Sequence, residues 1–485
     1  METPQKVVTR FAPSPTGFMH IGGVRTALFA YLLARQNNGT FILRIEDTDQ
    51  ARSVEGSLEH LQESLKWLGL EWDYGPDKPG PFGSCIQSER LSTYKEWAEK
   101  LVAKGLAYPD PYTQEEVEAF RQKAQVEKRA FLYRDHRPET FGVWDGTTAL
   151  RFKVPELKRY EWDDEARGTM SAGPEALDDF VLIKADGFPT YNLAHIVDDY
   201  NMGVTHIFRS DEWIASFPRF MSLYEALEIE RPVFVTLPPI LRSDRTKKLG
   251  KRDGAKDALD YKKEGYLPEA MLNYLALVGW NPGTEQEIFS LQELIDQFTM
   301  SRIQKSGAVA NEEKLDWINR EHIKRLDQSG FWTNGETFVP TWVYMIDTEY
   351  KMLAKIEPLL RDRIEKFSDI ATLFEQGELD YFFKEPACEP SMMVWKALKD
   401  TPDGLEVTKG YLTKVIEILE PMTEESWNYD GIKNALMPYA EEVGKGNVLW
   451  PLRVALSGRE KSPDPFELAS ILGKETVLKR INAVI

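Results

Sequence analysis

Cysteine is scarce in this sequence, and long apolar runs are absent. Only two cysteines, Cys85 and Cys388, occur among the 485 residues, and they lie far apart. A disulfide framework is therefore not expected, and a reducing, cytoplasmic environment is indicated. No apolar run approaches the roughly 18 to 20 residues that a bilayer-spanning helix needs. Residues 1–10 have no apolar leader core, so neither a membrane segment nor a targeting peptide is predicted.

Basic residues are also fewer than acidic ones. Lysine and arginine number 60 against 78 aspartates and glutamates, which gives a net charge of −18. This balance argues against a general nucleic-acid coat protein, so a nucleic-acid partner would need a local basic surface. The six histidines are scattered, and no Cys/His cluster has zinc-ligand spacing, so no zinc site is predicted.

The amount of hydrophobic sequence is ordinary. Hydrophobic residues make up 42% and charged residues 28%, as in globular proteins. A chain of this length is expected to form two to four domains.

The first hundred residues follow a strand, loop, helix and strand pattern. Residues 6–11 are rich in strand formers, and residues 12–17 form a turn-rich loop with two prolines and a glycine. Residues 24–35 carry apolar side chains at helical spacing, and residues 41–45 are strand-like again. This order predicts a βαβ unit of a parallel sheet.

A second α/β half and a long helical part follow. Residues 180–184, 205–208 and 232–237 are predicted strands, with a helix expected up to Asp199. After about residue 258 the periodicity becomes helical and stays so to the last residue. The sequence therefore predicts an α/β sheet domain with an irregular insertion, followed by an all-helical part.

The first chemical motif lies between the first strand and the first helix. It reads Phe-Ala-Pro-Ser-Pro-Thr-Gly over residues 11–17 and continues with His20, Gly22 and Gly23. Glycines at a helix N-terminus allow a phosphate to approach free backbone N–H groups. Taken alone, the motif fits a nucleotide site, or a simple βα turn with a capping histidine.

The second motif is a basic loop, Lys-Lys-Leu-Gly-Lys-Arg at residues 247–252. Several cations on a glycine-containing loop can close over a triphosphate and neutralise the charge that develops there. By itself, a solvated basic loop is the simpler interpretation.

The third motif, Leu-Arg-Ile-Glu-Asp-Thr-Asp at residues 43–49, follows the second strand. Ligands of open α/β sheets bind at the carboxyl ends of strands. Glu46 is therefore a candidate to hold a substrate ammonium group, and an acidic loop that caps the next helix is the alternative.

The fourth motif joins residues 187–191, Gly-Phe-Pro-Thr-Tyr, to residues 209–213, Arg-Ser-Asp-Glu-Trp. Tyr191, Arg209 and Trp213 would stand near strand ends and could line a small polar pocket. Ordinary packing of the two aromatic rings is the alternative.

Together, the order and spacing of these motifs resemble the bacterial glutamyl-tRNA synthetases, which are class I aminoacyl-tRNA synthetases. The resemblance covers the whole chain and is most specific over the first 320 or so residues. It rests on the segments RFAPSPTG, HIGG, RIEDTD, LKWLGL, QSER, DGFPTYNLAHIVDD, MGVTHIFRSDEW, KLGKR, YLPEAMLNYLALVGW, EKLDWIN and ALSGRE.

The resemblance implies a domain plan. A Rossmann-like α/β catalytic domain would consist of residues 1–105 and 186–257. An inserted α+β domain at 106–185 would bind the tRNA acceptor end. A helical stem-contact domain at 258–322 and an all-α anticodon-binding region at 323–485 would follow.

The resemblance also implies roles for individual residues. The catalytic residues would be His20, Lys248 and Lys251. Glutamate would contact Arg10, Ser14, Glu46, Tyr191, Arg209 and Trp213. ATP would contact Pro13, Thr16, Gly17, His20, Gly22, Gly23, Lys248, Leu249, Lys251 and Arg252. Arg361 and Arg363 are candidates for anticodon contact, with solvated helix charges as the alternative.

The implied reaction joins L-glutamate to tRNA(Glu) with ATP and Mg²⁺, and a monomer is expected. Two departures from the family pattern stand out. Gly250 replaces the serine usual in the KMSKS-type loop, which adds loop freedom. Residues 108–112 lack the zinc-binding cysteines that many relatives carry, so no zinc is predicted.

Several alternatives stay open. The enzyme could be non-discriminating and also charge tRNA(Gln), because that choice depends on a few anticodon contacts. A glutaminyl enzyme is disfavoured because the C-terminal part is predicted to be helical, whereas that relative has β-barrels there. A truncated tRNA-modifying paralogue is disfavoured because it normally lacks the C-terminal region that this chain has. From other classes, a small nucleotidyltransferase or a non-catalytic tRNA-binding protein are the competing hypotheses.

Overall fold

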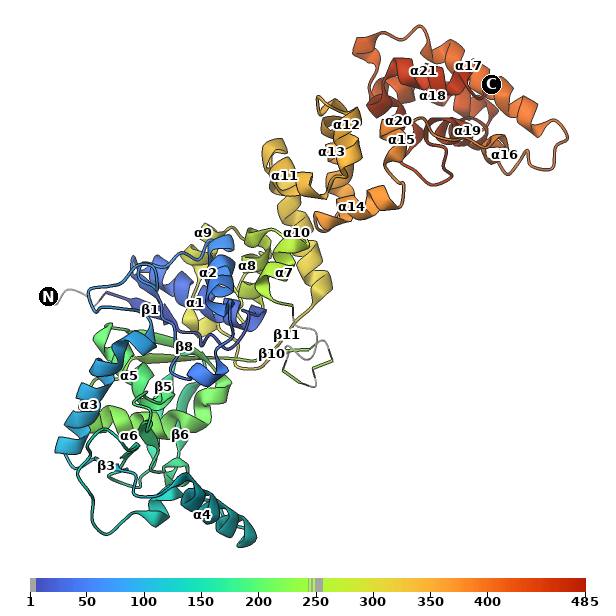
Figure 1. The fold of residues 1–485 in the computed structure, drawn as a ribbon. Helices are drawn as coiled ribbons and strands as arrows, with labels where there is room; N and C mark the ends of the chain where they lie inside the picture. Colours follow the sequence, from blue (N-terminus) through green and yellow to red (C-terminus); the bar gives the residue numbers. More distant parts are fainter. Residues whose placement is uncertain (1–5, 243, 246, 249–255) are drawn as a thin grey trace. The chain divides into compact units, whose positions relative to one another are not determined.

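The computed structural model describes residues 6–242, 244–245, 247–248 and 256–485. These residues form two compact units, Met1–Asn319 and Arg320–Ile485 (Figure 1). The first unit is an α/β domain with a central β-sheet, and the second unit consists of helices. The predicted fold class, an α/β domain with an all-helical C-terminal part, is confirmed.

A six-stranded sheet lies at the centre of the first unit (Figure 1). Its four parallel core strands pair in the order β2-β1-β8-β9. A hairpin, β5-β6, extends the sheet beyond β9: β5 runs parallel to β9 and β6 antiparallel to β5. The strands are β1 (Val8–Phe11), β2 (Thr40–Leu43), β5 (Tyr160–Asp164), β6 (Gly168–Ala172), β8 (His206–Ser210) and β9 (Val233–Leu237).

Parallel pairing brings four carboxyl ends to one edge of the sheet. In the register, Phe11 of β1 lies opposite Leu43 of β2, and Ser210 of β8 lies opposite Leu237 of β9. The segments after these strands begin at this edge, where open α/β sheets bind ligands. Three of the four chemical motifs follow directly from these strand ends.

Helix α1 (Ile21–Gln36) covers one face of the sheet, together with α8 (Pro268–Leu277) and α9 (Leu291–Gln297). Its N-cap is His20, and so the helix begins three residues before the predicted start at residue 24. It ends at a sharp return to β2, where Gly39 is required: a Cβ there would lie 2.3 Å from the carbonyl oxygen of Val7.

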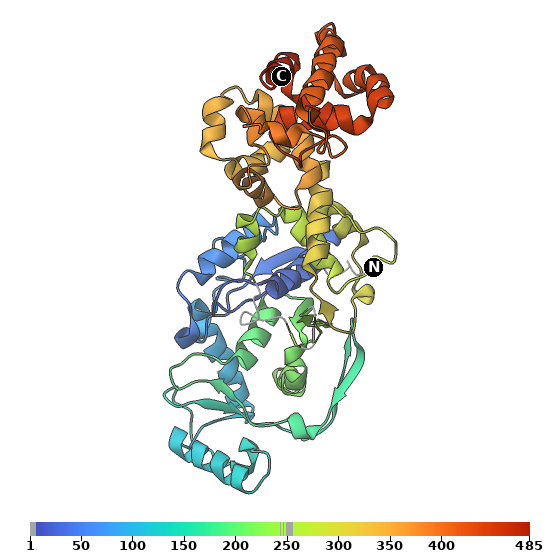
Figure 2. The same cartoon turned by 90° about the vertical axis from the view of Figure 1, so that its right-hand side faces the viewer.

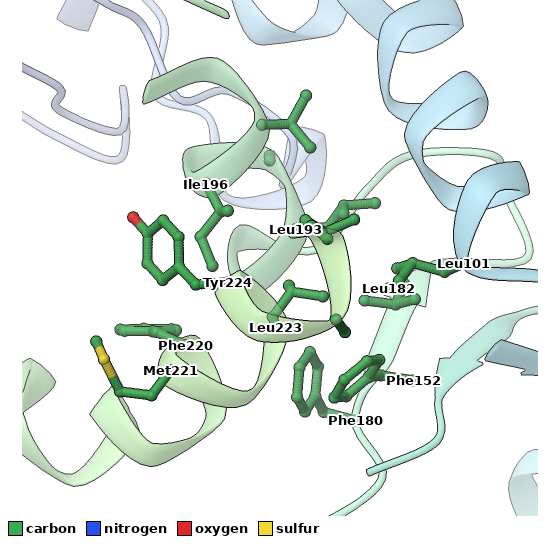
Figure 3. Packing of buried hydrophobic residues seen from close by; sticks show 14 of the residues in the cluster. Leu101, Phe152, Phe180, Leu182, Leu193, Ile196, Phe220, Met221, Leu223 and Tyr224 are labelled. Carbon is green, nitrogen blue, oxygen red and sulfur yellow. The ribbon is translucent and has the colours of Figure 1, made fainter. Parts of the chain in front are cut away.

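The other face is covered by α3 (Leu91–Ala103), α5 (Tyr191–Asn201) and α6 (Phe217–Leu227). Figure 3 shows side chains of α5 and α6 that pack together and reach Phe152 and Phe180. Successive strand residues point to opposite faces. Ile207 of β8 therefore enters this core. The next residue, Phe208, points to the α1 side, where its ring centroid lies 6.4 Å from that of Phe298.

The segment predicted as an insertion contains its own small sheet. Strands β3 (Ala107–Pro109), β4 (Leu150–Phe152) and β7 (Val181–Ile183) pair antiparallel. Helix α4 (Gln114–Val126) begins at a capping box formed by Thr113 and Glu116. The β5-β6 hairpin leaves this segment between β4 and β7 and joins the central sheet (Figure 2).

One predicted strand therefore belongs to a different sheet. Residues 180–184 were expected in the second parallel half, but β7 pairs with β4 in the three-stranded sheet. A short apolar run predicts a strand, whereas its partner depends on how the chain returns in space. The expectation of a second parallel half was correct for β8 and β9 and wrong for β7.

The first unit also contains a third, smaller sheet and further helices. Strands β10 (Ile240–Leu241) and β11 (Ala308–Val309) form a two-stranded parallel sheet. The other helices are α2 (Ser57–Trp67) and α7 (Ala258–Lys263), and α10 (Glu312–Arg325) includes the last residues of the first unit and the first residues of the second.

Every residue of the second unit is described, and none of them forms a strand. One buried side chain joins three parts of it: Arg480 of α21 donates to the carbonyl oxygens of Leu456, Tyr381 and Lys384. The helices are α11 (Gln328–Gly335), α12 (Thr341–Ile346), α13 (Lys351–Arg363), α14 (Ser368–Glu375), α15 (Asp380–Phe383), α16 (Pro390–Met393), α17 (Gly404–Leu419), α18 (Tyr429–Val443), α19 (Lys445–Ser457), α20 (Pro465–Leu472) and α21 (Lys474–Asn482).

Candidate active site

A cavity of about 780 Å³ opens at the carboxyl edge of the parallel strands. Its walls come from the loop after β1, the start of α1, residues 46–52 after β2, and residues 208–213 at the end of β8. Lys184, Tyr191 and Lys248 are also part of the lining. The cavity thus joins segments from all four chemical motifs.

The start of α1 forms one end of the cavity. The Nδ1 atom of His20 accepts a hydrogen bond from the N–H of Gly22 at 3.1 Å. In a neutral ring, Nε2 then carries the proton and is a hydrogen-bond donor. Gly22 leaves room for this ring, because a Cβ there would lie 2.9 Å from His20 Cε1. Free N–H groups at the N-terminus of a long helix favour an anion such as a phosphate.

The loop over residues 12–17 is tied to the segment after β2. The N–H of Glu46 donates to the carbonyl of Pro13 at 3.0 Å, and the N–H of Val54 donates to Pro15 at 2.9 Å. Pro13, Ser14 and Thr16 line the cavity. Gly17 does not belong to the lining, and its φ of 148° suits the turn that leads into the helix.

Arg209 projects from β8 into an aromatic cage at the other end. Its guanidinium carbon lies 5.4 Å from the ring centres of Phe217 and Phe220. The side chain is buried, yet Nε, Nη1 and Nη2 have no hydrogen-bond partner among the residues that the structure describes. A buried cation without partners costs free energy, so this group is built to receive an acceptor from a ligand.

Stacked rings border this guanidinium. Tyr191 lies 4.1 Å from Trp213 on one side and 4.4 Å from His195 on the other, between ring centroids. Burial raises the pKa of the Tyr191 phenol to about 12, although Arg209 opposes the shift, so the phenol stays a neutral donor at neutral pH.

Arg10 and Glu46 place opposite charges on the cavity wall. Arg10 donates from Nε to Asp199 at 2.9 Å, and Glu46 accepts from Arg44 at 2.9 Å. Burial raises the pKa of the Glu46 carboxyl, while Arg44 and Arg10 act in the opposite direction. The wall can therefore bind both an ammonium and a carboxylate.

The cavity lining is more basic than the chain as a whole. Lys248 Nζ pairs with Glu212 Oε2 at 3.2 Å near the α1 end. Among the described residues, three lining carboxylates, Glu46, Asp49 and Glu212, face a larger set of cations. These cations are Arg10, Arg25, Arg52, Lys184, Arg209 and Lys248. A net negative chain thus carries a local site for an anionic ligand.

Comparison with known proteins fits this geometry. The sequence model described as the catalytic domain of the class I tRNA synthetases (E and Q) matches residues 6–317. The chain belongs to this family. A second model, described as an anticodon binding domain, matches residues 333–485.

Individual members of the family are similar over nearly the whole chain. A glutamate–tRNA ligase of Clostridium botulinum is 42% identical over 98% of this chain and 97% of its own length. A glutamate–tRNA ligase of Clostridium acetobutylicum is 40% identical over the same shares. A crystal structure of a glutamate tRNA ligase from Elizabethkingia meningosepticum in complex with its amino acid has a TM-score of 0.84. It is 33% identical and covers 99% of both chains.

The structure brings most predicted site residues to one cavity. All six predicted glutamate contacts line it: Arg10, Ser14, Glu46, Tyr191, Arg209 and Trp213. Of the predicted ATP contacts, Pro13, Thr16, His20, Gly22, Gly23 and Lys248 line it and Gly17 does not. Leu249, Gly250, Lys251 and Arg252 lie outside the described residues.

The two anticodon candidates belong to the second unit. Arg361 donates to the carbonyl oxygens of Ile323 at 2.6 Å and Leu326 at 2.7 Å, and it pairs with Glu357. Arg363 pairs with Glu378 and is about one third exposed. Arg361 is thus engaged in packing of its own unit, and contact of either residue with an anticodon stays a prediction.

Several charged residues at the site were given no role from the sequence. Arg25, Arg52 and Lys184 line the cavity, and Arg44 and Asp199 lie behind its wall. Arg44 stands two residues before Glu46 in the same motif, a spacing that places both side chains on one side of an extended segment, and this was an available signal. For Arg25 and Lys184 the sequence offered no such signal, because neither residue lies in one of the four motifs.

No group of three or more His, Cys, Asp or Glu side chains suited to a metal occurs among the residues with described coordinates. Within the same ranges, no helix is long and apolar enough to cross a membrane.

Proposed function

We propose that this chain is a glutamate–tRNA ligase, which activates L-glutamate with ATP and transfers it to the 3′-terminal adenosine of tRNA(Glu). The observation that carries the proposal is Arg209, a buried guanidinium in the aromatic cage that has no hydrogen-bond partner among the described residues. The relatives named glutamate–tRNA ligase support the same activity.

Arg209 fits the side chain of glutamate better than that of glutamine. Its planar fork can donate two parallel hydrogen bonds to a carboxylate, and the aromatic cage keeps water away from the pair. Glutamine would lose the charge-assisted part of this interaction and leave the guanidinium uncompensated. The Tyr191 phenol stands beside the cage as a further donor.

Glutamate would extend from the cage toward the wall of opposite charges. Glu46 would receive the α-ammonium group, and Arg10 with Ser14 would hold a carboxylate near the start of α1. MgATP would bind as substrate with its phosphates at the helix N-terminus, near His20 and Lys248.

The chemistry needs no covalent enzyme intermediate. A carboxylate oxygen of the glutamate α-carboxyl group attacks the α-phosphorus of ATP, the bond to the β-phosphate bridge breaks, and pyrophosphate leaves. A ribose hydroxyl of the terminal adenosine then attacks the carbonyl carbon of glutamyl-adenylate, and AMP leaves. The chain aligns the reactants, while Lys248 and the N–H groups of α1 stabilise charge on the phosphates.

The rest of the chain would bind the tRNA. The three-stranded sheet with α4 would hold the acceptor end, and the helical second unit would recognise the anticodon by stacking and hydrogen bonds to unpaired bases. The enzyme would act as a monomer, which light scattering of the purified protein measures.

Aminoacylation with radiolabelled glutamate tests the proposal. The purified chain is incubated with ATP, Mg²⁺ and tRNA(Glu), beside a parallel reaction with tRNA(Gln). We expect charging of tRNA(Glu). Charging of both tRNAs would establish a non-discriminating enzyme, and charging of neither, with tRNA binding intact, would overturn the catalytic proposal in favour of a tRNA-binding protein.

A further inference from the structure

A line of ion pairs runs behind the cavity wall and connects the two opposite charges that face the cavity. Arg10 donates to Asp199 from Nε at 2.9 Å and from Nη2 at 3.3 Å. Arg44 donates to the same carboxylate from Nη1 at 2.7 Å and to Glu46 from Nη2 at 2.9 Å. The order is therefore Arg10, Asp199, Arg44, Glu46, with alternating sign.

Only the two ends of this line reach the cavity. Arg10 and Glu46 line it, whereas Arg44 and Asp199 are not among the described residues that do. Arg44 is fully buried and Asp199 is 2% exposed. Any effect of these two inner residues on a ligand must act through the outer two.

The neighbouring carboxylate on α5 provides a contrast. Asp198 is fully buried as well, but it accepts from Arg90 at 2.8 Å, Gln87 at 2.9 Å and Tyr94 at 2.8 Å. None of these partners lines the cavity. Arg44 Nε also lies 3.8 Å from Asp198, a longer contact than the 2.7 Å hydrogen bond from Arg44 to Asp199. The two aspartates therefore differ in their hydrogen bonds: those of Asp198 tie α5 to residues 87–94, and those of Asp199 tie it to Arg10 and Arg44.

The inner pair determines where the outer groups point. Asp199 occupies Nε and Nη2 of Arg10, which fixes the plane of that guanidinium and leaves Nη1 as its remaining nitrogen, 3.3 Å from the carbonyl of Phe208. Arg44 holds Oε1 of Glu46 and so restricts rotation of this carboxylate at the cavity wall. Charges held in place before binding lose little freedom when the ligand arrives.

We infer that Arg44 and Asp199 are positioning residues for the amino acid: they hold Glu46 for the α-ammonium group and Arg10 for a carboxylate of glutamate. This inference rests on the proposed function and goes beyond it, because neither residue touches the substrate. Binding of glutamate should depend on the inner pair, and binding of ATP at the start of α1 should not.

Loss of Arg44 should weaken the hold on the ammonium group. Without this cation, Glu46 and Asp199 would be two buried carboxylates that share Arg10, and the carboxylate of Glu46 would protonate or turn away. The lost charge-assisted hydrogen bond corresponds to a rise of about 10- to 100-fold in the KM for glutamate. The KM for ATP should stay within about twofold, because the N-terminus of α1 is unchanged.

The test compares Arg44→Gln with Arg90→Gln in the full-length chain. Both substitutions remove one buried arginine, but Arg90 contacts Asp198 and the carbonyl oxygens of Phe82 and Ser84, away from the wall. The measurements are the KM values for glutamate and ATP in tRNA(Glu) charging, at a temperature where both variants are folded by circular dichroism. A non-hydrolysable glutamyl-adenylate analogue supplies a direct Kd.

We expect only Arg44→Gln to raise the KM for glutamate and the Kd of the analogue, with Arg44→Lys intermediate. Equal effects of Arg44→Gln and Arg90→Gln, or a loss confined to kcat, would overturn the inference. Should Arg44→Gln not fold, the isosteric pair Asp199→Asn and Asp198→Asn makes the same comparison, with the same expected split. Absence of glutamate charging by the wild type would instead refute the proposed function.

Discussion

Lys248 Nζ lies 3.2 Å from Glu212 Oε2 at the side of the cavity that faces the start of α1. Both side chains are about half exposed, so the pair itself adds little to folding stability. The pKa of the Glu212 carboxyl is lowered. Burial acts to raise it, but a hydrogen bond from Ser210 and the charge of Lys248 together outweigh burial. An exposed ion pair beside an anion site is easily exchanged for an ion pair with a phosphate.

Replacement of Lys248 should therefore slow the reaction more than it weakens the fold. We expect Lys248→Met to lower kcat for tRNA charging about 100-fold, because one cation is lost where phosphate charge develops. The thermal midpoint should change little. Glu212→Gln is the matched control: it releases Lys248 without removing it and should leave kcat within a few-fold. A similar loss in both variants would count against this role of Lys248.

Substitution of Arg209 should change amino-acid selection. Arg209→Gln removes the charge in the aromatic cage, so we expect the KM for glutamate to rise about 100-fold or more while the KM for ATP stays the same. Arg209→Lys keeps the charge but loses the planar fork and should be intermediate. The measurement is kcat/KM for glutamate and for glutamine. An unchanged ratio between these amino acids in Arg209→Gln would contradict the assignment.

Stability should fall in mild acid, in part through His195. Its Nδ1 lies 2.6 Å from the carbonyl oxygen of Tyr191 and donates to it. Burial lowers the pKa of His195 well below its ordinary value; Arg209 and Arg10 act in the same direction and Asp199 in the opposite one. The unfolded chain therefore takes up a proton first as pH falls below about 6.5, and stability decreases by up to about 1.4 kcal/mol per pH unit.

His195→Phe should reduce this acid dependence, because the ring stack on Tyr191 remains and the titration is lost. Thermal midpoints at pH 7.5 and 5.5 make the comparison. Burial also lowers the pKa of His206, so a smaller dependence of the same sign should remain. The same fall in midpoint in the variant and the wild type would show that His195 is not responsible.

In the second unit, Arg361 and Arg363 should separate folding from tRNA binding. Arg361 donates to the carbonyls of Ile323 and Leu326 and lies over the ring of Phe331. Arg361→Gln should therefore destabilise this unit by about 1–3 kcal/mol. Arg363 forms a partly exposed pair with Glu378, and Arg363→Gln should cost less than about 1 kcal/mol.

Filter binding of tRNA(Glu) completes this comparison. If Arg363 contacts the anticodon, its substitution lowers tRNA affinity at unchanged stability, and the loss diminishes at high salt. Weaker binding that follows only the loss of stability in Arg361→Gln would assign both residues to folding.

Local elements were predictable because their patterns are local. The strand, helix and strand over β1, α1 and β2 follow from residue preferences and helical spacing within 40 residues. The start of α1 was predicted three residues late, because the capping role of His20 depends on its own side-chain hydrogen bond to Gly22. The β5-β6 hairpin was missed although Tyr160 and Trp162 alternate with exposed residues, the usual pattern of a half-buried strand.

The site shows the same division. Arg10, Glu46, Tyr191 and Arg209 were predicted from motif resemblance, and all four line one cavity. Lys184, the residue after β7 (Val181–Ile183), was not, because no motif contains it and only the fold brings it to the cavity. The pairing of Asp199 with Arg10 joins residues 189 positions apart, and no spacing rule connects them.

The sequence by itself determined the fold class and the residue types that the chemistry requires, since propensity, turn residues and motif order are properties of short segments. Only the tertiary structure decided which charges are neutralised and which stay unpaired. Arg44 is surrounded by carboxylates, while Arg209, equally an arginine after a strand-forming run, has none among the described residues. That difference arises because burial makes the energy of a charge depend on neighbours that the fold brings from distant segments.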